Sequence, residues 1–317
     1  MWFAIPPIFG RKSTANIAIR RPTPTTARSS ACFIIQPPAM RKSDLSSRST
    51  PSLIGYVAHM RSALLIGVIL AAGMGRRLQG LCGDVPKCLI SLGGMPLLHW
   101  QVRAFLLHGA TRFAVVVGFK AETVEATFRH LFPRLDASFI LNPDYARTNT
   151  LYSLYLALRQ VDDDVLFANG DVLFGPKLVR RLLTGGGSAI AVCRRQCGDE
   201  EVKVVAKGER VTRIGKEISP EECIGEFVGV AVWRRKDLVA VQKALEPRAG
   251  TDEGRRLFFE AAVQDALPEL PLRWVDVSDL PVVEIDFPSD YRQAQELLPS
   301  VEVEWNLTEE NHANPAS

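Results

Sequence analysis

The sequence predicts a doubly wound α/β fold, in which helices cover both faces of a mostly parallel sheet. The run at residues 64–71, LLIGVILA, is uncharged and lacks polar alternation, as is typical of a strand buried on both faces. A second such run, RFAVVV, occupies residues 112–117, and amphipathic helical patterns separate these and later apolar runs. Strands and helices that alternate along a chain are the signature of this fold class.

The elements are expected in a regular order through the first half of the chain. The first strand ends in a glycine-rich loop, and the turn Gly93-Gly94 precedes the first long helix. Asn149 or Thr150 is suited to cap a later helix that carries Leu151, Leu154 and Leu158. Further strands are expected at residues 89–92, 137–141 and 165–169, with helices at 97–108 and 121–131.

The second half has a different pattern. Residues 188–233 contain short strands joined by charged turns, with no helical pattern between them, so a small antiparallel extension over the acceptor site is expected. Two helices, at 237–245 and 252–266, follow it. The last elements are a strand at 282–285 and a terminal helix from Ser289.

Composition limits the classes of function. Of 317 residues, 47% are hydrophobic, which is ample for a packed core. Residues 1–60 carry eight Lys or Arg and a single acid, Asp44, so the net charge of +3 conceals an acidic remainder and gives no argument for nucleic-acid binding. The uncharged stretch at 62–75 is shorter than the roughly 20 residues of a membrane span, so no membrane span is expected.

The cysteines predict no metal or disulfide framework. Six are present, without a CxxC pair or a histidine at zinc spacing. Reduced, mostly buried thiols and a cytoplasmic location are therefore expected. The sequence leaves the oligomeric state open, a homo-oligomer included.

Three regions are expected along the chain. Residues 1–60 are rich in Pro, Ser, Thr and Arg and predict a disordered basic extension. An organelle transit peptide is an alternative that seven prolines disfavour, and Met60 as the working N-terminus is another. A catalytic domain is expected at residues 61–299, followed by a flexible acidic tail at 300–317.

The loop after the first strand is suited to phosphate. Gly73 and Gly75 allow a tight bend and close approach of backbone N–H groups to an anion, while Arg77 and Lys87 supply positive charge. An ordinary strand-to-helix turn is the simpler alternative for such a loop. A dinucleotide fingerprint would need a third glycine where Leu78 stands, and a P-loop would need Lys-Ser or Lys-Thr at residues 81–82, which are Leu and Cys.

The motif LAAGMGRRL followed by Pro86-Lys87 resembles the opening of the GT-A-like nucleotidyltransferases, which transfer a nucleoside monophosphate from an NTP to a phosphorylated acceptor. Arg76 stands where Ser or Thr is common in that family. The resemblance extends over about residues 63–298 and implies catalytic roles for Arg77 and Lys87. It implies nucleotide contacts from Leu70, Ala71, Ala72, Gly73, Gly75, Asn149 and Gly170.

Two acids follow strands far apart in the sequence. VLFANGD places Asp171 at the carboxyl end of a central strand, where open α/β sheets bind ligands, and EIDFPSDY places Asp286 after a later one. Alone, each would more commonly be a turn or cap residue. The resemblance implies that both bind Mg²⁺, so their carboxylates are expected within about 6 Å of each other.

The segment NPDYARTNTLYSLYLA resembles the branch that makes CDP-linked products from phosphocholine and similar phospho-alcohols. CTP and such an acceptor are therefore the predicted substrates. Tyr152, Glu226 and Glu260 are the expected acceptor contacts, because an ammonium group calls for aromatic rings and acids. Tyr145, Phe227 and Phe259 lie in the same segments.

Two other functions remain open. One is a sugar-1-phosphate uridylyl- or thymidylyltransferase on the same fold. The other is a non-catalytic nucleotide-sensing module, which the presence of every motif residue disfavours: Gly73, Arg77, Lys87, Asp171 and Asp286.

Overall fold

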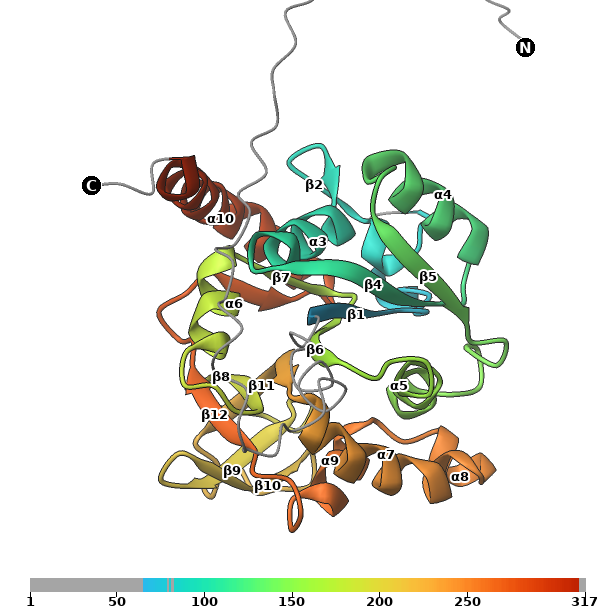
Figure 1. Ribbon diagram of the computed structural model, residues 1–317, viewed down its shortest axis with the longest axis vertical. Helices are drawn as coiled ribbons and strands as arrows, with labels where there is room; N and C mark the ends of the chain where they lie inside the picture. Colours follow the sequence, from blue (N-terminus) through green and yellow to red (C-terminus); the bar gives the residue numbers. More distant parts are fainter. Residues whose placement is uncertain (1–64, 79, 81–82, 314–317) are drawn as a thin grey trace, which may run out of the picture. The chain divides into compact units, whose positions relative to one another are not determined.

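The computed structural model describes residues 65–78, 80 and 83–313, and a nine-stranded sheet is its central element (Figure 1). The strand order is β5-β4-β1-β6-β11-β8-β12-β10-β9. The strands are β1 (Leu65–Ala71), β4 (Ala110–Val117), β5 (Asp136–Leu141), β6 (Asp164–Asn169), β8 (Ala189–Cys193), β9 (Lys203–Lys207), β10 (Arg210–Gly215), β11 (Gly225–Trp233) and β12 (Arg273–Asp276). The predicted disordered extension, residues 1–60, lies outside the described residues.

The sheet is mixed, which corrects the expectation of a mostly parallel one. β1 pairs in parallel with β4 and β6, and β4 pairs in parallel with β5. β11 is antiparallel to both β6 and β8, and β10 is antiparallel to β9 and β12, whereas β12 runs parallel to β8. The segment that supplies β8 to β11 has no crossover helices, so short turns can reverse the chain and join its strands antiparallel.

The predicted small extension is also larger than expected and belongs to the main sheet. β8 and β11 are interior strands, and the β9–β10 hairpin at the end of the strand order pairs back onto β11 through β9. All nine residues of β11 are buried, and its apolar side chains belong to both apolar clusters of the main sheet, so this segment is part of the central core rather than a cover over it.

Helices cover both faces of the sheet, which confirms the doubly wound arrangement (Figure 1). Residues alternate along β1: Ile69 and Ala71 face one apolar cluster, and Val68 and Leu70 face the other. One cluster includes α3 (Leu97–Leu107), α4 (Ala121–Leu131), α6 (Pro176–Leu183) and α10 (Pro288–Ala313). The other includes α5 (Thr150–Leu158), α7 (Arg235–Ala249) and α9 (Glu260–Ala266), with the short α8 (Asp252–Arg255) packed on α5 and α7.

Short elements connect the carboxyl edge of the sheet to its surroundings. β7 (Val172–Phe174) pairs antiparallel with β13 (Val282–Glu284), and β2 (Ser91–Leu92) with β3 (Met95–Pro96). The 3₁₀ turns η1 (Arg76–Leu78) and η2 (Lys87–Leu89) lie on the loop after β1. η2 and β2 occupy the place of the strand expected at 89–92, and β7, α6 and β12 were not expected.

Residues 300–313, which belong to the segment expected to be a flexible tail, are helical in the structure. α10 continues to Ala313, beyond the expected domain end at 299. Val301 and Trp305 are buried, and the Arg103 guanidinium lies 4.3 Å from the Trp305 ring centroid. These two apolar residues are four apart, one helical turn, which the acidic composition of the segment obscured. Within the described residues, no helix has the length and apolarity to cross a membrane.

Candidate active site

The loop after β1 brings backbone and charge to the carboxyl edge of the sheet. Gly75 has φ of +60°, and a Cβ there would lie 3.2 Å from the Cβ of Lys87, so glycine is favoured on both counts. Gly75 O accepts a hydrogen bond from Leu78 N at 2.9 Å, which closes the turn that presents Arg77. The loop therefore places Arg77 and Lys87 over the same strand end.

β6 ends beside this loop at a point where the two backbones touch. Gly170 N donates to Leu70 O at 3.0 Å, and a Cβ on Gly170 would lie 2.5 Å from that same oxygen. Only glycine fits there. The next residue, Asp171, is consequently held at the junction of β1 and β6, at the edge where open α/β sheets bind ligands.

Three carboxylates meet at this edge: Asp171, Glu284 and Asp286, with one oxygen from each within 4.8 Å of the others. The distance confirms the expected proximity of the two aspartates, and their metal-binding role stays a prediction. Val172 of β7 pairs with Glu284 of β13, and Ile285 N donates to Asp171 O at 2.9 Å, so the backbone fixes the cluster.

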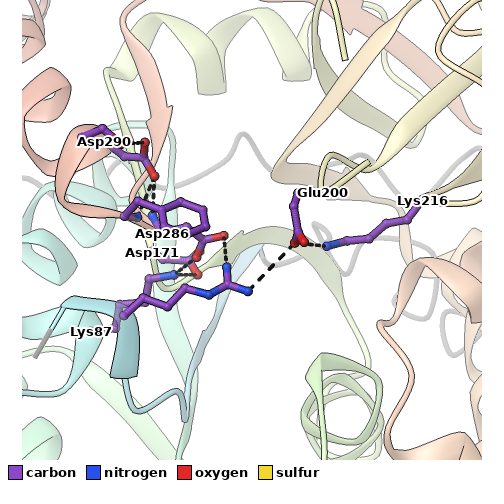
Figure 2. A network of polar contacts seen from close by, with 9 residues as sticks. Lys87, Asp171, Glu200, Lys216, Asp286 and Asp290 are labelled. Carbon is purple, nitrogen blue, oxygen red and sulfur yellow. Dashed lines mark hydrogen bonds and ion pairs between the residues drawn. The ribbon is translucent and has the colours of Figure 1, made fainter. Parts of the chain in front are cut away.

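Lys87 lies between the two aspartates (Figure 2). Its Nζ donates to Asp171 Oδ2 at 2.7 Å and also to Asp286 Oδ1. Burial alone would lower the pKa of Lys87, but the charges of Asp171 and Asp286 outweigh it and raise the pKa above its ordinary value. Lys87 is thus a permanent cation that offsets part of the negative charge of the cluster.

Glu284 is a site residue that the sequence analysis missed. Burial, then the charges of Asp171 and Asp286, raise its pKa well above the ordinary value. The signal was present in EIDF, because residues two apart on a strand share a face and Glu284 precedes Asp286 by two.

Arg77 reaches across the cleft to a second unexpected acid. Its guanidinium lies 3.7 Å from Asp286 and 4.0 Å from Glu200, and Lys216 Nζ lies 3.8 Å from Glu200 on the other side (Figure 2). All of these groups are partly exposed, so each ion pair is weak by itself. Glu200 nevertheless links the loop after β1 to the end of β10.

The cleft around these groups has a volume of about 500 Å³. Most of the predicted nucleotide contacts line it: Leu70, Ala72, Gly73, Gly75, Asn149 and Gly170. Ala71 does not, because alternate residues of β1 point to opposite faces and its side chain, 3% exposed, lies in the core. Asn149 caps α5, its side chain accepting from Thr150 N at 2.8 Å.

Only some of the predicted acceptor residues line the cleft. Glu226 and Glu260 line the cleft, but Tyr152 does not. The Tyr152 ring stacks on Tyr155, and the Arg255 guanidinium lies 4.8 Å from its centroid. Its position on α5 turns the ring toward Arg255, at the end of the neighbouring helix α8. Tyr145 and Phe227 line the cleft, whereas Phe259 is a core residue.

This arrangement gathers charged side chains and a glycine loop at the carboxyl edge of the sheet, which is where open α/β sheets bind ligands. A family model extends that description: the MobA-like NTP transferase domain matches residues 67–268, and the chain belongs to this family. It is accordingly an enzyme, a nucleotidyltransferase.

Relatives share most of its length. The choline-phosphate cytidylyltransferase of Streptococcus pneumoniae is 25% identical over 232 residues, 73% of this chain and 97% of that protein. The CMP-5'-(3-aminopropyl)phosphonate synthase of Streptomyces rubellomurinus is 30% identical over 240 residues, 72% of this chain but 38% of that protein. The solved inositol-1-phosphate CTP transferase from T. maritima has a TM-score of 0.63 at 21% identity, covering 74% of this chain and 96% of that one. This last likeness shows a shared Rossmann-like GT-A fold.

Proposed function

We propose that the protein transfers CMP from CTP to a small phosphorylated acceptor, phosphocholine or a related phospho-alcohol, and releases pyrophosphate. One observation carries the proposal: Lys87, Arg77 and the carboxylates of Asp171 and Asp286 converge in one cleft beside the glycine loop. The relatives from S. pneumoniae and S. rubellomurinus are both named for forming CMP-linked products, which favours CTP as the donor.

The carboxylate cluster fits a hard divalent cation. Asp171 Oδ1 is buried and accepts no hydrogen bond from any described residue, and such an oxygen is suited to a metal. Mg²⁺ takes oxygen ligands from one or two carboxylates together with phosphate oxygens. Asp171 and Asp286 would hold the ion, with Glu284 beside them, and the ion would supply charge neutralisation for the phosphates.

The chain's own groups would orient and stabilise the transfer. A bond forms between an acceptor oxygen and the α-phosphorus of CTP while the bond from that phosphorus to the pyrophosphate oxygen breaks. The acceptor oxygen is already ionised, so no general base is required. Arg77, exposed at the mouth of the cleft, would hold the departing phosphates, and Lys87 would exchange its aspartate contacts for the α-phosphate.

Pyrophosphate release from the purified full chain tests the proposal. Mg²⁺ is combined with CTP, UTP or dTTP and with either phosphocholine or a hexose 1-phosphate. The expected kcat/KM is at least tenfold higher for CTP with phosphocholine than for UTP or dTTP with the sugar phosphate. The reverse order would assign the sugar-nucleotide reaction instead. Absence of pyrophosphate in every mixture would contradict CMP transfer to phosphocholine.

A double variant controls for contaminating activity. Asp171→Asn with Asp286→Asn keeps the size of both side chains and removes both carboxylate charges. This variant is expected to release no pyrophosphate at any Mg²⁺ concentration. Activity equal to that of the wild type would contradict the metal-binding assignment, even where the CTP reaction itself is confirmed.

A further inference from the structure

The side of the cleft opposite the glycine loop carries more acids than bases. The loop between β8 and β9, the end of β10, β11 and α9 contribute the cleft-lining charges Glu200, Glu201, Glu226, Glu260, Arg195 and Lys216. We call this set the acidic wall. Four carboxylates outnumber two cations there, although both substrates of a nucleotidyltransferase are anionic. An excess of negative charge beside a phosphate is less unfavourable where the ligand itself carries a cation close to those acids.

Glu260 is the member of the acidic wall that most requires a partner. Its residue is 4% exposed, it lines the cleft, and its Oε2 accepts no hydrogen bond from any other described residue. Burial raises the pKa of Glu260 to about 7. A buried carboxylate that lacks a donor is costly, so a ligand with N–H groups would relieve that cost.

The other carboxylates of the acidic wall already have partners. Glu226 forms an ion pair with Arg195, and Glu200 lies 3.8 Å from Lys216. Glu201 Oε2 accepts a hydrogen bond from Gly198 N at 2.7 Å. Glu260 is therefore the carboxylate of this wall that is left for a ligand.

The aromatic rings of the cleft are largely occupied by the chain itself. The Lys216 ammonium lies 4.3 Å from the Phe258 ring centroid, and the Arg77 guanidinium lies 4.7 Å from that of Phe287. Phe227 is 2% exposed, and Tyr145 packs on Phe119, at a centroid distance of 6.3 Å, beyond β4. A quaternary ammonium binds through open aromatic faces. Among the described residues that line the cleft, few aromatic rings have a face that is free for a ligand.

We propose that the acceptor carries a primary ammonium group, which donates hydrogen bonds to Glu260 while its phosphate or phosphonate faces the aspartates. The class is thus an aminoalkyl phosphate or aminoalkyl phosphonate. A quaternary ammonium has no N–H and leaves Glu260 without a donor. This inference rests on the proposed function and narrows its acceptor. The contrary possibility is that Lys216 turns from Glu200 to neutralise Glu260, which would make the ligand's cation unnecessary.

A methylation series on the wild-type protein tests the inference. CTP and Mg²⁺ are kept constant, and the acceptors are phosphoethanolamine, its N-methyl and N,N-dimethyl forms, and phosphocholine. We expect kcat/KM to be highest for the primary amine and to fall at least tenfold when the last N–H is lost. Equal or higher kcat/KM for phosphocholine overturns the primary-ammonium inference and leaves the proposed function standing. Turnover confined to a hexose 1-phosphate overturns both.

A matched pair of variants tests the residue. Glu260→Gln keeps the shape of the side chain and removes its charge, and Glu269→Gln makes the same change on the exposed surface, outside the cleft. Glu260→Gln is expected to raise the KM for phosphoethanolamine at least tenfold. Its KM for hydroxyethyl phosphate, an analogue with a hydroxyl in place of the ammonium group, should change less than threefold, and Glu269→Gln should change neither.

Equal losses on both acceptors would show that Glu260 is structural and would overturn its assigned contact. So would an unchanged KM for phosphoethanolamine, as expected if Lys216 neutralises Glu260. Circular dichroism of each variant establishes that it is folded. If Glu260→Gln does not fold, the methylation series on the wild type decides the inference by itself.

Discussion

The two halves of the sheet line the cleft in different ways, one mainly with backbone and the other mainly with charged side chains. At the ends of the parallel strands β1, β4 and β6, glycines allow close approach of the backbone: a Cβ on Gly170 would lie 2.5 Å from the backbone oxygen of Leu70, and one on Gly118 would lie 2.6 Å from the Tyr145 side chain. The half around β8 to β11 instead lines the cleft with charged side chains. Backbone geometry suits a constant group such as a triphosphate. Side chains suit an acceptor that differs between relatives, because they can change without altering the fold.

The largest effect on the reaction rate is expected for Lys87, which lies on the loop after β1 and contacts both aspartates. Lys87→Ala removes the cation between Asp171 and Asp286, so turnover should fall on the order of 10³-fold, as for other preorganised electrostatic contacts. Steady-state pyrophosphate release measures it. Lys243→Ala, an exposed change on α7, is the control and should leave the rate unchanged. A kcat near that of the wild type in Lys87→Ala would remove Lys87 from the mechanism.

The buried acid Glu260, in the second half, should make the free energy of unfolding depend on pH. The pKa of Glu260 is raised from 4.5 to about 7, so the folded state retains a proton that the unfolded state loses. The part of the folding stability that depends on Glu260 is therefore fully present below about pH 4.5. It declines as the pH rises to 7, by at most about 3 kcal/mol. Glu260→Gln should consequently stabilise the protein at pH 8 and have little effect at pH 5.

Urea unfolding at pH 5 and pH 8 gives the two free energies of unfolding. Glu269→Gln, an exposed change beside α9, should shift neither. If Glu260→Gln destabilised the protein equally at both pH values, the side chain would be stabilising through packing or an N–H contact, and the cost assigned to its buried charge would be wrong.

A glycine substitution tests whether the first half depends on backbone contact. In Gly170→Ala the new methyl would overlap Leu70 O, and neither strand can yield easily, so a loss of about 1–3 kcal/mol is expected. At Gly73 a Cβ meets no atom within 4 Å, and Gly73→Ala should leave the melting temperature unchanged. Equal melting temperatures for the two variants would show that the β1–β6 junction tolerates a side chain.

The smallest effect is expected outside both halves. We propose that residues 1–60 are dispensable, because their composition cannot bury enough apolar surface to offset the entropy of ordering. A chain that begins at Met60 should keep the melting temperature and the kcat/KM of the full chain. A melting temperature several degrees lower would mean that the segment packs on the domain.

The sequence predicted the structure best where the local apolar pattern matches the way the residues are packed in the folded protein. β1, α3 and α4 lie within about a residue of their expected bounds, because the apolar residues that predict them are the residues buried in the core. The proximity of Asp171 and Asp286 was expected for a similar reason, since strand ends at one edge of a sheet meet.

Other features depend on packing that no local pattern encodes. Tyr152 lies on the expected helix, but the rotation of α5 turns it toward Arg255. Glu200 is an exposed loop acid, and only the fold brings it between Arg77 and Lys216. α10 was missed beyond residue 299 because its two buried apolar residues stand among acids. Antiparallel strands were expected at residues 188–233, but their place inside the main sheet depends on strand order, which composition does not determine.

The attachment of Asp286 to α10 has a consequence during synthesis of the protein. Asp290, in the first turn of α10, accepts hydrogen bonds from the backbone N–H groups of Asp286 at 2.9 Å and Phe287 at 2.8 Å. A nascent chain that has reached only α9 already contains the glycine loop, Lys87 and Asp171, but not the second aspartate. Because ribosomes build chains from the amino end, the carboxylate cluster of Asp171, Glu284 and Asp286 is completed only after the segment that leads into α10 has been made. Translation order thus separates synthesis of the loop after β1 from assembly of the whole cluster.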